Sequence, residues 1–228
     1  ISPIGNKAME DADTGDFYFS DGSFADKSTE LASWQKAACI GVVLKKGRDN
    51  SGDWADDGNY TLKDGTTPMQ KVHGYVLALH DANDGNSCKW GSSGTKVICD
   101  MNQTTGFNGY SSTQTIVAFN NAQGGSLQSA FPAAYHAVNY ETICPAPSKT
   151  SGWFLPSGGQ CRYWLKNRDV ILRSIQNAGG NGWKNSYWSS SEGILNPASY
   201  AHYLDMRFSD MDYDRKRNSN AVRSCLAF

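Results

Sequence analysis

Short apolar runs separated by long polar stretches recur along the whole chain, and they predict strands in a loop-rich protein. Asp16–Ser20 holds three consecutive aromatic residues and is followed by the turn signal Asp21-Gly22. Cys39–Leu44 and Val72–Leu79 are rich in Val and Leu, as buried strands are. We therefore predict three strands here. Residues 1–15 show no period and are expected to form a loose N-terminal arm.

Two stretches have helical rather than strand periodicity. In Ser126–Tyr140 the apolar residues recur at helical spacing, and the Pro-containing segment Cys144–Pro147 follows as a stop. Gln160–Ala178 carries one apolar face, and Gly179-Gly180 ends it, because a helix C-terminus favours a residue that adopts positive φ. Two helices and a small, mainly antiparallel sheet make the predicted fold class α+β.

The C-terminal third contains three more predicted strands, over Ser186–Ser190, Ala201–Phe208 and Ala221–Phe228. Successive side chains of a strand point to opposite faces. In the middle strand we therefore expect one set of alternate residues in the core and the other set in solvent. The expected core set is Leu204, Met206 and Phe208, and the expected solvent set is Tyr203, Asp205 and Arg207.

The region between the outer two of these strands is polar. More than half of residues 185–220 are Asn, Ser, Tyr, Asp or His, a composition that cannot form a core. A rigid frame that displays polar and aromatic side chains is typical of a binding surface. We therefore predict a single domain over residues 16–228, with its ligand-binding face in 185–220.

Composition and charge exclude several classes of partner. The chain has 228 residues, 39% hydrophobic and 19% charged, and its net charge is −1. So small a net charge creates no overall field that would attract nucleic acid. No run of 18 apolar residues occurs, so we expect no direct membrane insertion.

The six cysteines bear on the cellular compartment. They lie at positions 39, 88, 99, 144, 161 and 225, and no pair has C-x-x-C spacing, which argues against a zinc ribbon. An even number of cysteines in a Gly-rich chain favours an exported protein with disulfides. Cys88 and Cys99 could close a short loop, although buried free thiols remain the alternative.

Several motifs together resemble a known family. Gly152–Ser157, Tyr187–Glu192 and Val222–Phe228 form one series, and Gly15–Ser23 and His73–Ala82 add to it. The series resembles a bacterial family of C-type-lectin-fold domains that includes the variable proteins of diversity-generating retroelements. The resemblance implies a C-type-lectin-like fold with a fixed scaffold and a diversified polar surface. It also implies a location on a bacterial surface, a pilus tip or a phage.

The same resemblance implies which positions contact a ligand. The candidate ligand-binding residues are Asn196, Ser199, Tyr200, His202, Tyr203, Asp205, Arg207, Asp210, Asp212, Tyr213, Asp214, Arg215, Arg217, Asn218 and Asn220. Trp188, Ser190, Glu192, Lys216 and Val222-Arg223 match the scaffold part of the pattern. Tyr200, Tyr203 and Tyr213 are expected to be exposed, since large rigid rings give contact area at low entropic cost.

The sequence also allows three chemical alternatives to simple ligand binding. Ser189–Ser191 could supply a nucleophile, but no Gly-x-Ser-x-Gly elbow is present, so backbone hydrogen bonding by these residues is the simpler reading. The acidic loop Asp49–Asp57 and the region of Asp81 could hold an ion, but the sugar-site tripeptides of calcium-dependent lectins are absent. Formylglycine-generating enzymes share the fold, and Cys161 and Cys225 are the cysteines to consider for that chemistry.

The sequence therefore predicts a non-catalytic ligand-binding protein without cofactor or metal, and with no nucleic-acid partner. Its expected ligand is a protein or glycan on a cell or phage surface, and its expected location is the bacterial cell surface or a phage particle. The first alternative is a structural or adhesive subunit of a bacterial surface or pilus assembly without a diversified site. The second is an enzyme of the formylglycine-generating type.

Overall fold

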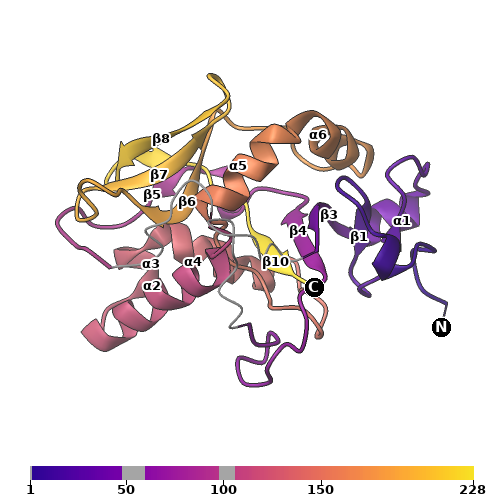
Figure 1. The fold of residues 1–228 in the computed structure, drawn as a ribbon, viewed down its shortest axis with the longest axis horizontal. Helices are drawn as coiled ribbons and strands as arrows, with labels where there is room; N and C mark the ends of the chain where they lie inside the picture. Colours follow the sequence, from indigo (N-terminus) through magenta and orange to yellow (C-terminus); the bar gives the residue numbers. More distant parts are fainter. Residues whose placement is uncertain (1, 48–59, 98–105) are drawn as a thin grey trace.

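A five-stranded antiparallel sheet with strand order β10-β4-β3-β1-β2 occupies the centre of the computed structural model (Figure 1). The structure describes residues 2–47, 60–97 and 106–228. The strands are β1 (Phe17–Phe19), β2 (Phe24–Ala25), β3 (Cys39–Lys46), β4 (Gly74–Ala78) and β10 (Cys225–Ala227). Since β10 pairs with β4, the C-terminal end of the chain closes a sheet built mainly by the N-terminal third.

A second sheet stands beside the first and carries the polar region. Its order is β6-β7-β8, with β6 (Ser186–Glu192), β7 (Tyr200–Asp205) and β8 (Asp210–Arg215). A two-stranded ribbon of β5 (Cys88–Lys89) and β9 (Ser219–Asn220) lies next to it. The Trp188 amide donates to the Ala221 carbonyl at 2.9 Å, which ties β6 to the chain leading into β10.

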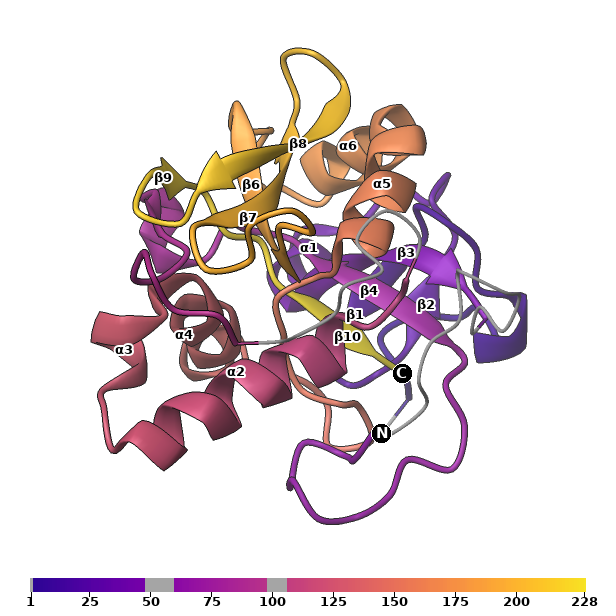
Figure 2. The same ribbon diagram turned by 60° about the vertical axis from the view of Figure 1, so that its left-hand side comes forward.

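Helices cover both faces of the central sheet (Figure 2). In β4, Tyr75 and Leu77 pack into one cluster with α5 and α6, whereas Val76 and Ala78 pack into another with α2 and α4. Both faces are therefore buried, which explains the continuous apolar runs of β3 and β4. The helices are α1 (Ser33–Ala38), α2 (Gly109–Gln123), α3 (Leu127–Ala130), α4 (Pro132–Asn139), α5 (Gly158–Lys166) and α6 (Arg168–Asn177).

The α+β class is confirmed, but the prediction of two helices is wrong, since the described residues form six α-helices. The predicted helix 126–140 breaks at Phe131, because Pro132 has no N–H to continue it. The predicted helix 160–178 divides at Asn167. α2 was not predicted, because its buried positions are mostly Gly, Ser, Thr and Asn rather than a repeating apolar set.

The N-terminal segment is packed, so the prediction of a loose arm over residues 1–15 is wrong for the part the structure describes. The Lys7 ammonium lies 2.6 Å from the buried Asp16 carboxylate, and Lys7 forms a β-bridge with Phe24. Ala12 is 1% exposed. At Gly5 an added Cβ would lie 2.0 Å from the Phe24 carbonyl oxygen, so close backbone contact requires glycine there.

The cysteines within the described residues are all free thiols. Cys161 and Cys225 are fully buried, and burial raises the pKa of both thiols, which makes them poor nucleophiles. The expected closure between Cys88 and Cys99 concerns a residue outside the described ranges. Among the described residues, no helix is long and apolar enough to cross a membrane.

Candidate functional site

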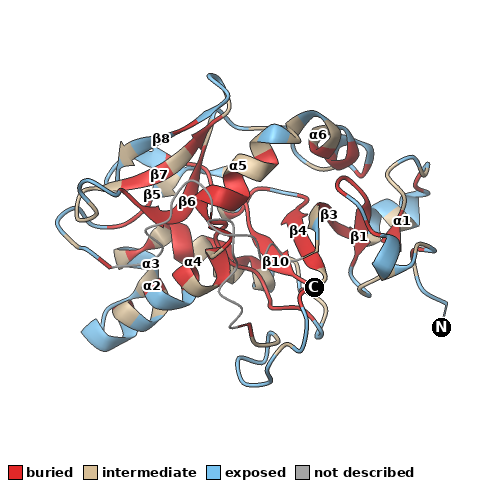
Figure 3. Ribbon diagram, viewed as in Figure 1, coloured by how far each residue is buried: buried red, intermediate tan, exposed pale blue. Residues whose placement is uncertain are grey.

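The candidate site is the β7–β8 hairpin with the loop that precedes it. The hairpin projects from the body of the protein, and its outer end is exposed (Figure 3). Leu204 and Met211 pair with each other close to the turn and are buried in the core, at 0% and 9% exposure. The hairpin is therefore a displayed element on a buried foundation, as the polar composition of residues 185–220 predicts.

The strand register divides the hairpin into two faces. Tyr200 lies opposite Arg215, and His202 lies opposite Tyr213. These four residues share one side of the sheet, which we call the aromatic face. The other side holds Tyr203 and the carboxylates of β7 and β8, and we call it the acidic face; its members are Tyr203, Asp205, Asp210, Asp212 and Asp214. One hairpin thus presents two chemically different surfaces.

Most of the predicted ligand-binding residues reach solvent. The exposed ones are Asn196, Arg207, Asp210, Asp212, Tyr213, Arg215, Arg217 and Asn218, and the half-buried ones are Ser199, Tyr200, Tyr203 and Asp214. The structure places all of these on β7, β8 and their connecting loops. Their role as ligand contacts stays a prediction.

Three predicted contact residues are buried instead. His202 is 2% exposed, Asp205 is 3% exposed and Asn220 is 4% exposed. The Asn220 side-chain N–H donates to Asp214 at 3.1 Å, and its amide oxygen accepts from Ser186 at 2.5 Å. These three side chains therefore support the exposed surface and are not part of it.

The alternation predicted for residues 203–208 ends early. β7 stops at Asp205, whose carboxylate accepts hydrogen bonds from the backbone N–H and the guanidinium of Arg207. Asp205 is therefore a turn residue, and the guanidinium beside it lowers its pKa to about 2. Beyond the turn Phe208 is 79% exposed, so its expected place in the core is wrong.

His202 is the buried member of the aromatic face. Its ring centroid is 4.1 Å from that of Tyr213, and neither ring nitrogen has a hydrogen-bond partner. Burial, together with the positive charge of Arg162, lowers the pKa of His202 to about 4. Asp212 acts in the opposite direction and is the weaker influence. The imidazole is therefore neutral at physiological pH.

This environment makes an acid-dependent loss of stability testable. Unfolded His202 takes up a proton near pH 6.5, whereas the folded chain resists protonation down to about pH 4. Stability contributed by the neutral ring should therefore fall as pH decreases from 6.5 towards 4, by roughly 3 kcal/mol in total. In thermal melts, the melting temperature of His202→Phe should therefore fall less than that of the parent as the pH decreases over this range. Parallel melting curves for the two proteins would contradict this assignment.

The frame beneath the hairpin is held by a buried ion pair. The Lys216 ammonium, directly after β8, pairs with the Glu192 carboxylate at the end of β6, and both side chains are 0% exposed. Lys216 also donates to the Thr95 carbonyl at 2.8 Å, and Glu192 accepts from the Val97 N–H at 2.9 Å. The pair thus joins two strand ends to the chain around residues 95–97.

The serine run belongs to the same frame. Ser189 donates to the His202 carbonyl at 2.9 Å, and the Ser191 hydroxyl accepts from the Gly158 N–H at 3.0 Å. Both serines are completely buried. They hydrogen-bond the backbone, as the simpler reading of the sequence predicts, and a substrate cannot reach them without unfolding the sheet.

The sequence contains two candidate groups of carboxylates for an ion site. Asp49–Asp57 lies outside the described residues. Asp81 is buried and accepts from the Arg223 guanidinium at 2.7 Å, and that guanidinium packs over the Trp183 and Tyr187 rings. Within the described ranges, no group of three His, Cys, Asp or Glu side chains is arranged to hold a metal ion.

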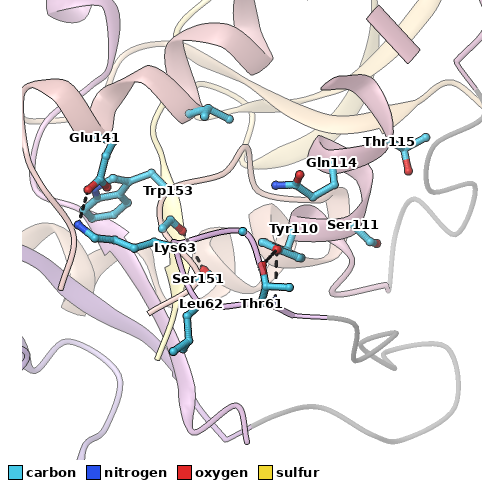
Figure 4. Close-up of a pocket in the computed structure, with 13 residues that line it drawn as sticks. Thr61, Leu62, Lys63, Tyr110, Ser111, Gln114, Thr115, Glu141, Ser151 and Trp153 are labelled. Atoms are coloured by element: carbon cyan, nitrogen blue, oxygen red, sulfur yellow. Dashed lines mark hydrogen bonds and ion pairs between the residues drawn. The ribbon is translucent and has the colours of Figure 1, made fainter. Parts of the chain in front are cut away.

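A cavity of about 570 Å³ lies away from the hairpin, between α2, α4 and the segment around Lys63 (Figure 4). The Lys63 ammonium and the Glu141 carboxylate form an ion pair of 2.6 Å across it. The hydroxyl groups of Tyr110 and Thr61 are 2.7 Å apart, and the Trp153 indole N–H donates to a backbone carbonyl. These polar groups therefore already have partners inside the protein.

Comparison with known proteins points to bacterial fimbriae. No family model matches the chain. The chain is 26% identical over 211 residues to the “Putative fimbrium tip subunit Fim1C” of Bacteroides ovatus, and the match covers 78% of this chain and 38% of that protein. It also resembles the crystal structure of a fimbrial protein from Bacteroides ovatus with a TM-score of 0.73 and 20% identity, over 94% of this chain and 48% of that one.

These matches have defined limits. At 20% identity the structural likeness shows a shared fold, so the fold of this chain is one that occurs in a fimbrial protein. The chain spans less than half the length of either relative. Neither comparison bears on the resemblance to variable proteins of diversity-generating retroelements or on the C-type-lectin-like fold, which stay predictions.

Proposed function

We propose that this chain is part of an adhesive subunit of a bacterial surface fimbria, exported to the cell surface and carried at or near the fimbrial tip. The similarity to a fimbrium tip subunit and to the fold of a fimbrial protein carries this proposal. It corresponds to the first alternative drawn from the sequence, an adhesive subunit of a surface assembly. The proposal assigns the chain no catalysis.

The binding surface in this proposal is the β7–β8 hairpin. An adhesin needs rigid, exposed groups that can meet a partner without first being ordered. The hairpin supplies them, because Leu204 and Met211 near its turn are buried in the core and the Glu192–Lys216 ion pair joins the other end of β8 to β6. Exposed Tyr and Arg side chains, the types that most often anchor interfaces, lie on it.

Diversification of this surface by a retroelement is a separate and finer proposal. The residue types on the hairpin are those that the resemblance implies for a variable protein. A second copy of the C-terminal coding region, beside a reverse transcriptase gene and differing at adenines, would support it. Identical hairpin sequences across many isolates of the source bacterium would contradict it, and the adhesive role would stand unchanged.

Immunogold electron microscopy tests the proposed location. Antibodies raised against the purified chain should label fibres on intact cells, with gold particles concentrated at the fibre ends. Label spread along the whole fibre would make the chain a stalk component. Label absent from the surface of cells that produce the protein would overturn the proposal.

The proposed adhesion should not depend on metal. The described residues contain no metal-binding cluster, and the tripeptides of calcium-dependent sugar sites are absent from the sequence. Attachment of cells or of the purified chain to its target surface should therefore be unchanged by EDTA. Attachment that is lost in EDTA and returns with calcium would show that an ion takes part.

A further inference from the structure

An apolar notch opens on the aromatic face, beside the strand end where Tyr200 and Arg215 pair. The loop 193–199 forms one wall with Leu195, and Tyr200 and Tyr213 form the other. Leu195 is 94% exposed and Ile194 is 46% exposed, which is unusual for residues of their size. Neither residue is among the candidate ligand-binding residues, because the family resemblance that implies those positions does not include them.

Backbone hydrogen bonds hold the loop that carries Leu195 in a defined position. The Gly193 N–H donates to the Tyr200 carbonyl at 2.8 Å, and the Tyr200 N–H donates back to the Asn196 carbonyl at 3.0 Å. The Gly94 N–H adds a bond to the Ala198 carbonyl at 2.8 Å. At Gly193 an added Cβ would lie 3.0 Å from the Tyr200 Cβ, so this close approach favours glycine. Leu195 is thus held in solvent by a defined turn.

The size and the walls of the notch restrict what can fill it. Its volume is about 190 Å³, smaller than the 300–1,000 Å³ of typical small-molecule sites. The walls are almost entirely carbon, so a saccharide would lose hydrogen bonds to water without replacing them. A single large apolar side chain fits these conditions, in the way that an anchor residue fills a pocket at a protein interface.

The charge beside the notch is positive. Arg215 lies directly opposite Tyr200 on the same face, and among the described residues no carboxylate pairs with its guanidinium. The aspartates of β8 lie on the acidic face instead. An exposed guanidinium beside an apolar notch is complementary to a carboxylate next to an apolar side chain.

We propose that this notch, with Arg215, is a docking site for a protein segment that presents a large apolar side chain next to an Asp or Glu. The inference rests on the proposed adhesive function and names the class of its partner as protein rather than glycan. Leu195 and Tyr213 contact the apolar side chain of the partner, and Arg215 forms an ion pair with its carboxylate.

Selection from a phage-displayed library of random dodecapeptides on the purified chain tests this proposal. Enriched peptides should share a Leu, Ile, Phe or Trp next to an acidic residue. A synthetic peptide of the enriched sequence should bind at least tenfold more weakly to Leu195→Ser and to Arg215→Glu than to the parent, by fluorescence anisotropy. Because Leu195 is exposed, Leu195→Ser should melt like the parent.

Two matched variants serve as controls. Ile143→Ser removes another exposed aliphatic residue, 63% exposed and outside the hairpin, and Arg173→Glu reverses another exposed arginine, on α6. Both should bind the peptide as the parent does. Equal binding by the Leu195→Ser variant, or selection that enriches no peptide, would overturn the notch proposal.

Two further results separate this proposal from others. If the parent forms dimers in analytical ultracentrifugation and Leu195→Ser does not, the occupant is a second copy and the proposal is wrong. If the chain binds a cell surface through glycans while Leu195→Ser binds equally well, the adhesive function stands and only the notch is refuted. If the parent itself binds no cell surface, the proposed function is contradicted.

Discussion

Glu192→Gln should destabilise the protein by about 3–5 kcal/mol, since it removes the negative charge that pairs with the buried Lys216 ammonium. Gln has nearly the same shape and can still accept from the Val97 N–H. The loss therefore isolates the charge. Chemical denaturation followed by tryptophan fluorescence measures it, with the linear extrapolation giving the free energy of unfolding.

The matched control removes both charges at once. In Glu192→Gln combined with Lys216→Met, both charges of this ion pair are removed, and replacing both members of a buried ion pair is often neutral for stability. The Met side chain should also pack on the Trp90 ring, whose centroid lies 4.2 Å from the ammonium it replaces. Most of the lost stability should therefore return. A double variant as unstable as the single one would show that the pair matters through shape, and the electrostatic account would be wrong.

Trp188→Ala should cost about 3–5 kcal/mol, the usual price of deleting a buried large aromatic side chain. Trp188 is 0% exposed, and its indole N–H donates to the Cys88 carbonyl at 2.8 Å. Its ring also meets Tyr203 edge-on, at 6.4 Å between centroids. The substitution therefore removes packing under the acidic face and takes the indole donor from the half-buried Cys88 carbonyl.

Trp34→Ala is the control for this loss. Trp34 belongs to α1, on the side of the protein away from the hairpin (Figure 1), and is 60% exposed. Its removal should change stability by about 0.5 kcal/mol or less. If the two tryptophan variants melt at the same temperature, β6 does not form the buried support that the structure places under the hairpin.

Parts of the fold could be read from the sequence because local apolar runs match buried strands. β3 and β4 were predicted for this reason. β8 was missed, since four of the six residues of Asp210–Arg215 are charged, although Met211 and Tyr213 alternate with the aspartates. Its pairing with β7 across the adjacent turn makes it a strand.

The site shows the same division between local pattern and tertiary context. Exposure of the polar hairpin followed from composition, whereas burial of His202 depends on α5 and Tyr213, which are distant in sequence or paired across the sheet. The notch could not be found from polarity, because Ile194 and Leu195 read as core residues. Gly193 before them and Pro197 after them were the turn signals that could have marked an exposed loop.

The most direct test of the account is binding of the purified chain to an array of cell-surface proteins, mucins and glycans. The parent is compared with a hairpin variant carrying Tyr203→Ala, Asp212→Ala and Arg215→Ala, and with Trp34→Ala as the control. The account predicts that the parent and Trp34→Ala bind the same targets, whereas the hairpin variant loses them with its melting temperature changed by only a few degrees. Full binding by the correctly folded hairpin variant would contradict the claim that this protein binds its partner through the β7–β8 hairpin.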